Sequence, residues 1–237
     1  MVPKELTEEQ KQRRVTICQD LLERQGDILG CVITGDEIWV YQYDPETKRQ
    51  IAQWKTANST WPKTFCQSKS RVKTILLTFF YIRRIVHYEF VPTGQIVNQI
   101  YYLEVLERLH EKVTWKRPEL FATSWILHHD NAPAHTALSV REFLATKRIT
   151  VLEYFAYSPD LAPSCFFLFP KIKEILKGGH FDDIDVIRSN TMAALKAIPQ
   201  NQFQNCFEGW TRCWHRCISS QGEYFEGDHG SIQQWGM

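Results

Sequence analysis

The stretch SWILHHDNAPAHTALSVREFLATK, residues 124–147, contains the change from strand to helix that decides the fold class. Residues 124–127 form a short apolar run typical of a strand, whereas residues 135–147 have the pattern of a helix. Asp130 therefore lies where a strand ends. In folds that mix strands and helices this is the usual position for chemistry, so Asp130 is the first candidate site residue.

The rest of the chain supplies the other elements of a mixed α/β domain. Strands are predicted at residues 31–43, 71–80, 84–92, 124–127 and 149–155, and helices at 5–25, 98–112, 135–147, 183–197, 200–218 and from about Phe166. Three strands in succession, followed by helices that alternate with short strands, predict one mixed sheet flanked by helices. The apolar stripe expected to face the core from the helix at 98–112 consists of Ile100, Leu103, Leu106, Leu109 and Val113.

Length and composition limit the class of protein. The chain has 237 residues, 43% of them hydrophobic, which suffices for one sizeable core or at most two small ones. We divide it into an N-terminal linker and helix, residues 1–30, and one domain, residues 31–237. No apolar run is long enough to span a membrane, and the charged N-terminus lacks the apolar core of a secretory signal. We therefore expect an intracellular protein without a membrane segment.

Seven cysteines are irregularly spaced, which is typical of reduced thiols rather than of a disulfide framework. One cluster stands out, because Cys213 and Cys217 are one helical turn apart with His215 between them. A zinc site is an alternative for these three side chains, although their spacing fits no common zinc finger.

The positive charge of the chain is concentrated in one region. The net charge is only +1, which argues against a protein that coats DNA through a generally basic surface. Residues 46–84, however, hold nine Lys or Arg and one acidic residue. Such a region is either a solvated face or a surface that contacts phosphates. The candidate DNA-binding residues in it are Lys48, Arg49, Lys55, Lys69, Arg71 and Lys73.

Two carboxylates on predicted strands are candidate metal ligands. Asp36 lies within the strand at 31–43, and Asp130 follows the strand at 124–127. Paired carboxylates on adjacent strands suit Mg²⁺ in phosphoryl transfer, because this hard cation prefers oxygen ligands. The alternative is that both residues only cap elements or form turns, as aspartates at strand ends often do.

Three segments resemble motifs of a known family. VITGDEIWVYQYDPETKRQIAQW (residues 32–54), HHDNAPAHTA (128–137) and YSPDLAPSCFFLFPKIKEIL (157–176) are similar to the catalytic domain of mariner-family transposases of the Tc1/mariner group. The transposase-derived part of fusions between a SET domain and a mariner segment shares this similarity. The resemblance implies an RNase H-like fold with a mixed five-stranded sheet. It also implies cut-and-paste DNA transposition by an acidic triad that holds two Mg²⁺ or Mn²⁺ ions.

The resemblance assigns roles to individual residues. Asp36 and Asp130 match the first two acids of the triad and are the implied metal ligands. Asn131 and His135 are expected to brace the loop after Asp130 or to contact DNA. We also expect the strands at 31–43, 71–80 and 84–92 to run antiparallel, with the strand before Asp130 beside the first.

The third acid of the triad is missing, because Cys165 occupies its position. A neutral thiol is a poor ligand for a hard cation. We expect Cys165 at the start of the helix near Phe166, with its side chain directed at the two aspartates. Other family positions also differ: YFAY (residues 154–157) replaces His-Pro-Pro-Tyr, and Tyr81 and Arg84 replace an Asp and a Gly. Weak metal binding and impaired catalysis are the implied consequences.

Members of the family carry two helix-turn-helix units before the catalytic domain, and the present sequence starts at MVPKEL. We therefore expect DNA binding to be mostly nonspecific, full transposition to be absent and the protein to act in the nucleus, with a homodimer left open. The predicted function is that of a transposase-derived, catalytically impaired DNA-binding protein. The alternative is a noncatalytic fragment that serves as a DNA- or protein-interaction module.

Overall fold

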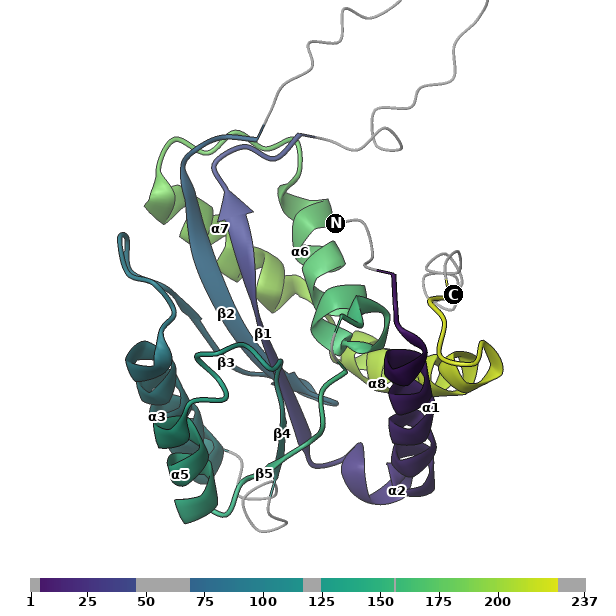
Figure 1. Cartoon of the computed structure of the whole chain (residues 1–237). Coiled ribbons are helices and arrows are strands. Elements are labelled where there is room, and N and C mark those ends of the chain that lie inside the picture. Colours follow the sequence, from purple (N-terminus) through teal and green to yellow (C-terminus); the bar gives the residue numbers. More distant parts are fainter. Residues whose placement is uncertain (1–4, 46–68, 117–124, 156, 226–237) are drawn as a thin grey trace, which may run out of the picture.

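Five strands form one mixed sheet in the computed structural model, which describes residues 5–45, 69–116, 125–155 and 157–225 (Figure 1). The strands are β1 (Val32–Tyr41), β2 (Lys73–Tyr81), β3 (Arg84–Phe90), β4 (Ile126–His128) and β5 (Thr150–Val151). Their order is β3-β2-β1-β4-β5. The first three run antiparallel, and β4 lies parallel to β1 on its other side. The predicted strand arrangement is therefore confirmed.

Helices cover both faces of the sheet. They are α1 (Glu8–Glu23), α2 (Gln25–Ile28), α3 (Gln99–Lys116), α5 (Leu138–Thr146), α6 (Phe169–Leu176), α7 (Ile184–Ala197) and α8 (Gln200–Ser219). Figure 1 shows α3 and α5 on one side of the sheet and α1, α6, α7 and α8 on the other. A 3-10 turn (Pro159–Leu161) and a π-helical turn (Ser164–Leu168) precede α6.

Each face of the sheet has its own hydrophobic core, because successive residues of a strand point to opposite faces. Val32, Ile38 and Val40 of β1 belong to the core beneath α1, α6 and α8, which also contains the buried Trp210 and Trp214. Ile33 of β1 belongs to the core beneath α3 and α5. A strand that is buried on both faces holds its register firmly, since a shift by one residue would exchange the two cores.

The stripe predicted for α3 is partly wrong. Leu106, Leu109 and Val113 are buried as expected, but Ile100 is 64% exposed. Each step of three residues falls about 60° short of a full helical turn. A series of such steps therefore carries Ile100 away from the core, and Tyr102 is buried in the first turns instead.

The first helix packs into the same core as the rest of the chain. Ile17, Cys18 and Leu21 of α1 lie in the core cluster shared with α8. Buried Arg14 donates hydrogen bonds to both carboxylate oxygens of Asp160, at 3.1 and 2.6 Å. The expected division of the chain at residue 30 stays a prediction. In the described part of the chain, we find no helix with the length and apolar character of a membrane span.

Two predicted elements are shorter than expected. The strand predicted at 149–155 pairs only at Thr150–Val151. The helix predicted from 135 begins at Leu138, because the residues before it form a turn in which the N–H groups of His135 and Thr136 bond to the carbonyl oxygen of Ala132. This turn directs the His135 side chain inward.

Candidate active site

Asp36 lies in the middle of β1, partly buried, opposite Thr78 of β2. Its Oδ1 accepts a hydrogen bond of 2.7 Å from the N–H of Glu37. Gly35 precedes it where the strand passes closely over a core aromatic ring, since a Cβ there would lie 2.4 Å from the ring of Phe79. The packing of this part of β1 therefore fixes the backbone that carries Asp36.

Asp130 lies two residues after the end of β4 and reaches the same region through the sheet register. Thr34 of β1 is the partner of His128, the last residue of β4. Asp36 and Asp130 each lie two residues beyond this pair, Asp36 within β1 and Asp130 past the end of β4. The Oδ1 of Asp130 accepts hydrogen bonds from the N–H of Ala132 at 3.0 Å and from Nδ1 of His135 at 2.5 Å. The fold thus brings together two carboxylates that are far apart in the sequence.

His135 bridges two carboxylates. Its Nδ1 bonds to Asp130, and its Nε2 lies 3.0 Å from Oε1 of Glu37. Its ring is 3% exposed and packs against Tyr102, with the ring centroids 3.8 Å apart. Burial alone would lower the pKa of His135, but the hydrogen bonds to Asp130 and Glu37 raise it to about 9. His135 is therefore a charged brace in the interior and does not lie on the surface that would meet DNA.

The two aspartates have different electrostatic environments. Burial and the negative charge of Glu37 raise the pKa of Asp36 to about 7, and the charge of Asp130 contributes in the same direction. For Asp130, burial also acts to raise the pKa, but the hydrogen bond from His135 outweighs it, and the pKa of this carboxyl is lowered. A nearby cation would favour the ionised form of both groups.

Cys165 faces Asp36 from the π-helical turn before α6, as the sequence led us to expect. Its Sγ donates a hydrogen bond of 3.4 Å to Oδ2 of Asp36. Burial and the negative charge of Asp36 raise the pKa of the Cys165 thiol well above its ordinary value, so the group is neutral at pH 7. The sulfur thus lies against one oxygen of the carboxylate without contributing a charge.

Only part of the candidate donor set suits a hard cation. In the described ranges, no three His, Cys, Asp or Glu side chains are arranged so that they could hold a metal ion. The carboxylates of Asp36 and Asp130 are oxygen ligands of the kind that Mg²⁺ and Mn²⁺ prefer. The protonated thiol of Cys165 does not fit such an ion. Two of the three positions assigned from the family motif therefore fit a divalent cation.

The predicted DNA-binding residues are only partly described. Lys48, Arg49 and Lys55 lie outside the described residues. The remaining basic residues of this set, exposed at the start of β2 and just before it, are Lys69, Arg71 and Lys73. Asn131 is exposed, and its Nδ2 donates a bond of 3.3 Å to the carbonyl oxygen of Tyr154, so it braces the loop.

The structure also identifies neighbours of the site that sequence reasoning missed. Glu37 is the second partner of His135. Lys173 of α6 lies close enough to Cys165 that its positive charge offsets part of the rise in the pKa of the Cys165 thiol. The position of Glu37 next to Asp36 in the sequence could have identified it as a neighbour of the site. No sequence signal distinguished Lys173 from the other lysines of its helix. Tyr154, from the altered YFAY segment, stacks on His128 with the ring centroids 4.9 Å apart.

The zinc alternative is not supported. Cys213 and Cys217 are buried in the core beneath α8, whereas His215 is exposed. A step of two residues along a helix turns the side chain by about 200°, so His215 points to the opposite side. These three side chains therefore do not converge on one ion.

The amino-acid sequence of the chain is similar to those of known transposases. A family described as transposase, partial DDE domain, matches residues 44–123. The mariner Mos1 transposase of Drosophila mauritiana is 33% identical over 231 residues, which cover 95% of this chain and 66% of that protein. The human histone-lysine N-methyltransferase SETMAR is 27% identical over 229 residues, which cover 95% of this chain and 33% of that protein. The chain thus spans less than two thirds of the length of these relatives.

Solved structures of Mos1 transposase are also similar to this chain. The crystal structure of the catalytic domain of Mos1 mariner transposase matches with a TM-score of 0.79 and 30% identity, covering 95% of this chain and 100% of that chain. The Mos1 mariner paired end complex with Mn matches with a TM-score of 0.86 and 32% identity, covering 95% of this chain and 66% of that chain. The five-stranded sheet with its flanking helices is thereby an RNase H-like fold. Together with the Asp36 carboxylate on β1 and the Asp130 carboxylate after β4, these similarities show that the chain belongs to the mariner transposase family.

Proposed function

We propose that this chain is a DNA-binding mariner transposase domain whose metal-dependent cleavage of DNA strands is impaired at Cys165. The observation that carries the proposal is the contact of 3.4 Å between Sγ of Cys165 and Oδ2 of Asp36. A neutral thiol there takes the place that the family motif gives to a third carboxylate. DNA as the substrate is supported by the relatives, since Mos1 has been solved as a paired-end complex and as a strand transfer complex.

The residues of the site have distinct roles in this proposal. Asp36 and Asp130 would hold a divalent cation, and Mos1 has been solved with Mn and with Mg. Such an ion, when bound, activates the attacking oxygen and stabilises the leaving oxygen of a phosphodiester. His135 keeps Asp130 ionised and oriented through its Nδ1 hydrogen bond, and its Nε2 holds Glu37. These contacts leave Oδ2 of Asp130 free of the hydrogen bonds that engage Oδ1.

Loss of one carboxylate should have a large effect on the rate. A metal site of this kind contributes several kcal/mol by stabilising charge in the transition state. Each 1.36 kcal/mol corresponds to about a tenfold change in rate. Cleavage by the chain with Cys165 should therefore be reduced by about three orders of magnitude relative to the same chain with a third carboxylate.

The test is Mg²⁺-dependent nicking of supercoiled plasmid. Cys165→Asp should raise the nicking rate, whereas the neutral and similarly sized Cys165→Asn should leave it low. Adding Asp130→Ala to Cys165→Asp should abolish nicking. If Cys165→Asp nicks no faster than Cys165→Asn, position 165 is not what limits catalysis. Efficient cleavage by the unmodified chain would also refute the proposal.

A noncatalytic function is the second candidate, and the neutral thiol of Cys165 favours it. In this alternative the chain is a DNA- or protein-interaction module without residual cleavage. A nuclease assay with Mn²⁺, whose geometric demands are less strict, separates the two functions. Nicking that disappears in Asp130→Ala supports the impaired enzyme, and no nicking above that variant supports the module.

Assembly and location in the cell are further parts of the proposal. The paired-end arrangement of the Mos1 complexes supports a homodimer on DNA, which light scattering with and without a DNA duplex would test. A protein that acts on chromosomal DNA must reach the nucleus of a eukaryotic cell, and imaging of a tagged chain would test this localisation.

A further inference from the structure

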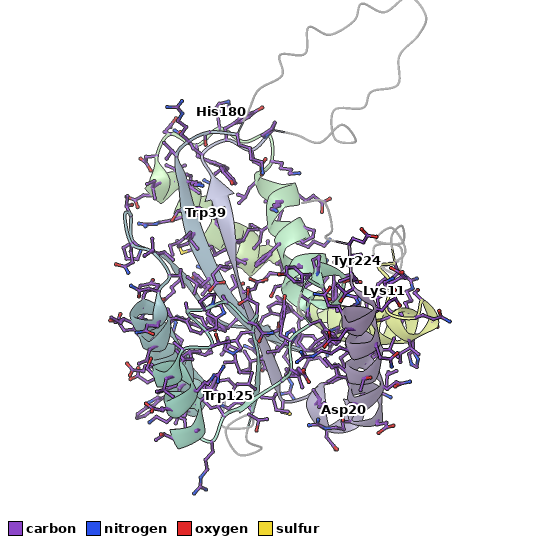
Figure 2. The ribbon with its side chains drawn as sticks, viewed as in Figure 1. Lys11, Asp20, Trp39, Trp125, His180 and Tyr224 are labelled. Carbon is purple, nitrogen blue, oxygen red and sulfur yellow. The ribbon has the colours of Figure 1, made fainter. Side chains whose placement is uncertain are left out.

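Two aromatic and two basic side chains form a surface that the proposed cleavage site does not use. We name Trp39 and Tyr41 of β1, with Lys69 and Lys73, the hairpin platform. The Nζ of Lys73 lies 3.9 Å from the ring centroid of Trp39, and the Nζ of Lys69 lies 4.7 Å from that of Tyr41. Figure 2 shows Trp39 beside the part of β1 and β2 that extends beyond α3. The lysines therefore sit over the rings instead of extending freely into solvent.

Trp39 keeps a large open surface despite this contact. The residue is 44% exposed, although it occupies a strand whose neighbouring positions 38 and 40 are buried. A cation–π pair alone would explain why Lys73 lies on the ring. It does not explain why the remaining surface of a large aromatic ring stays uncovered. Exposed aromatic rings flanked by lysines are the usual components of a surface that stacks nucleic-acid bases.

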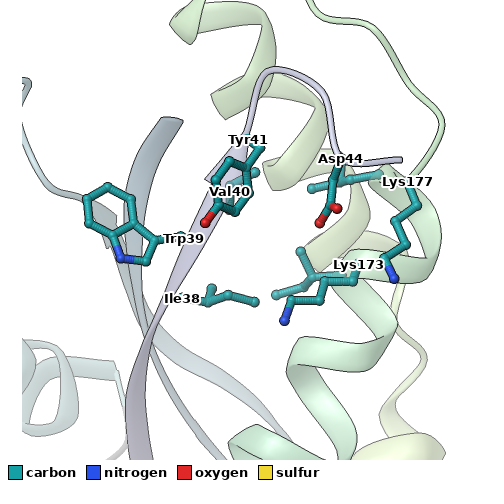
Figure 3. Close-up of a pocket in the computed structure, with 9 residues that line it drawn as sticks. Ile38, Trp39, Val40, Tyr41, Asp44, Lys173 and Lys177 are labelled. Carbon is teal, nitrogen blue, oxygen red and sulfur yellow. The ribbon is translucent and has the colours of Figure 1, made fainter. Parts of the chain in front are cut away.

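The side chains around the platform are mostly basic, and one of them, Lys173, also lies near the candidate active site. Tyr41, Asp44, Lys173 and Lys177 line one shallow pocket, with Tyr41 and Asp44 on the β1 side and the lysines on the α6 side (Figure 3). Asp44 is paired with Lys69 at 3.6 Å. Partial burial lowers the pKa of Lys173, and the positive charges of Lys69 and Lys177 lower it further. This local excess of positive charge favours a polyanion such as a DNA strand.

The position of Trp39 on β1 relates the platform to the cleavage site. Trp39 follows Asp36 by three residues on the same strand, a distance of about 10 Å. Lys173 contributes to both regions, because it lines the pocket beside Tyr41 and its charge also acts on Cys165. Three residues along a strand also change the face, so Trp39 and Asp36 point to opposite faces of β1, and the platform lies beside the cleavage site and not within it.

We propose that the hairpin platform binds unpaired nucleotides of DNA beside the cleavage site. Bases stack on Trp39 and Tyr41, and the phosphates between them contact Lys69 and Lys73. This inference rests on the proposed DNA-binding function and adds a preference for unpaired bases. In duplex DNA the bases are stacked on one another and cannot use the exposed ring.

The experiment measures the affinity of the full chain for three labelled probes of equal length by fluorescence anisotropy in EDTA. The probes are oligothymidylate, the same strand without bases, and a duplex. Trp39→Ala should weaken binding of oligothymidylate by about tenfold and leave the strand without bases unchanged. Trp39→Phe should retain most of the affinity. Lys73→Gln should weaken binding of both single strands, since its contact is to phosphate.

The matched control is Trp115→Ala, because Trp115 is 84% exposed at the end of α3. It should leave all three affinities unchanged. If the chain binds DNA but Trp39→Ala weakens the three probes equally, or weakens none, the platform proposal is wrong. If the unmodified chain binds none of the probes at low salt, the proposed DNA-binding function itself fails.

Discussion

At the scale of single residues, His135 connects the acidic groups of the site. It lies between Asp130 and Glu37, which would otherwise face each other as two uncompensated negative charges. Tyr102 covers one side of its ring, and the hydroxyl of Tyr102 contacts Nδ1 of His129 at 2.7 Å. The buried rings of His135, Tyr102 and His129 thus fix the orientation of Asp130, whose own side chain is 37% exposed. We conclude that the second histidine of the HDNAPAH segment is a positioning residue.

Replacing His135→Leu should destabilise the fold. The change removes two hydrogen bonds to carboxylates and leaves Glu37 and Asp130 without their shared partner, which should cost about 2–4 kcal/mol. Urea unfolding followed by circular dichroism at pH 7 in EDTA measures the loss. The control is His215→Leu, since His215 is exposed on α8. A loss no larger than that of the control would mean that the bridge contributes little to stability.

At the scale of elements, β1 carries different functions on its two faces. Asp36 meets Cys165 on one face, whereas Glu37 meets His135 on the other. Trp39 lies further along β1, in the part of the strand that α3 does not cover (Figure 2). The alternation of side chains along one strand thus separates the candidate metal ligand from its supporting network.

Gly35→Ala should disturb β1 where it carries Asp36. The added Cβ would lie 2.4 Å from the ring of Phe79, and this ring is only 1% exposed, so it cannot move aside without repacking the core. Overpacking of this kind costs about 1–3 kcal/mol. Gly26→Ala in α2 is the control, because nothing lies within 4 Å of its added Cβ. Thermal unfolding of both variants measures the difference, and equal midpoints would contradict the close approach.

At the scale of the whole molecule, the charge is nearly balanced overall but unevenly distributed. The net charge is +1, while residues 46–84 hold nine Lys or Arg and one acidic residue. The described part of this region begins at Lys69, which pairs with Asp44 of the pocket that Lys173 and Lys177 also line. DNA binding by such a molecule depends on a local basic surface and not on its net charge.

The affinity for duplex DNA should therefore fall steeply with salt. Neutralised phosphates release counterions, so even a few phosphate contacts should weaken binding by about tenfold or more between roughly 50 and 200 mM salt. The double variant Lys69→Gln/Lys73→Gln should reduce the slope of log affinity against log salt by about 2. Lys147→Gln, exposed after α5, should leave the slope unchanged. An affinity insensitive to salt would identify the basic region as a solvated face.

The sequence alone was sufficient to predict the order of the main helices and strands and to identify the family. Alternating and helical periodicities are local, so they located β1, β2, β3 and most helices within a few residues. The three motifs, once matched to the mariner pattern, brought Asp36, Asp130 and Cys165 into one site before any coordinates. Local periodicity failed at the ends of elements, where Ile100 turns out of the core and the strand predicted at 149–155 pairs over only two residues.

Only the tertiary structure decided which side chains meet. The bridge from His135 to Glu37 depends on the parallel register of β1 and β4, which no local pattern contains. The approach of Lys173 to Tyr41 depends on how α6 packs beside the end of β1. The physical reason is that periodicity reflects the geometry of one element, whereas contacts between elements depend on strand register and on the packing of two separate cores.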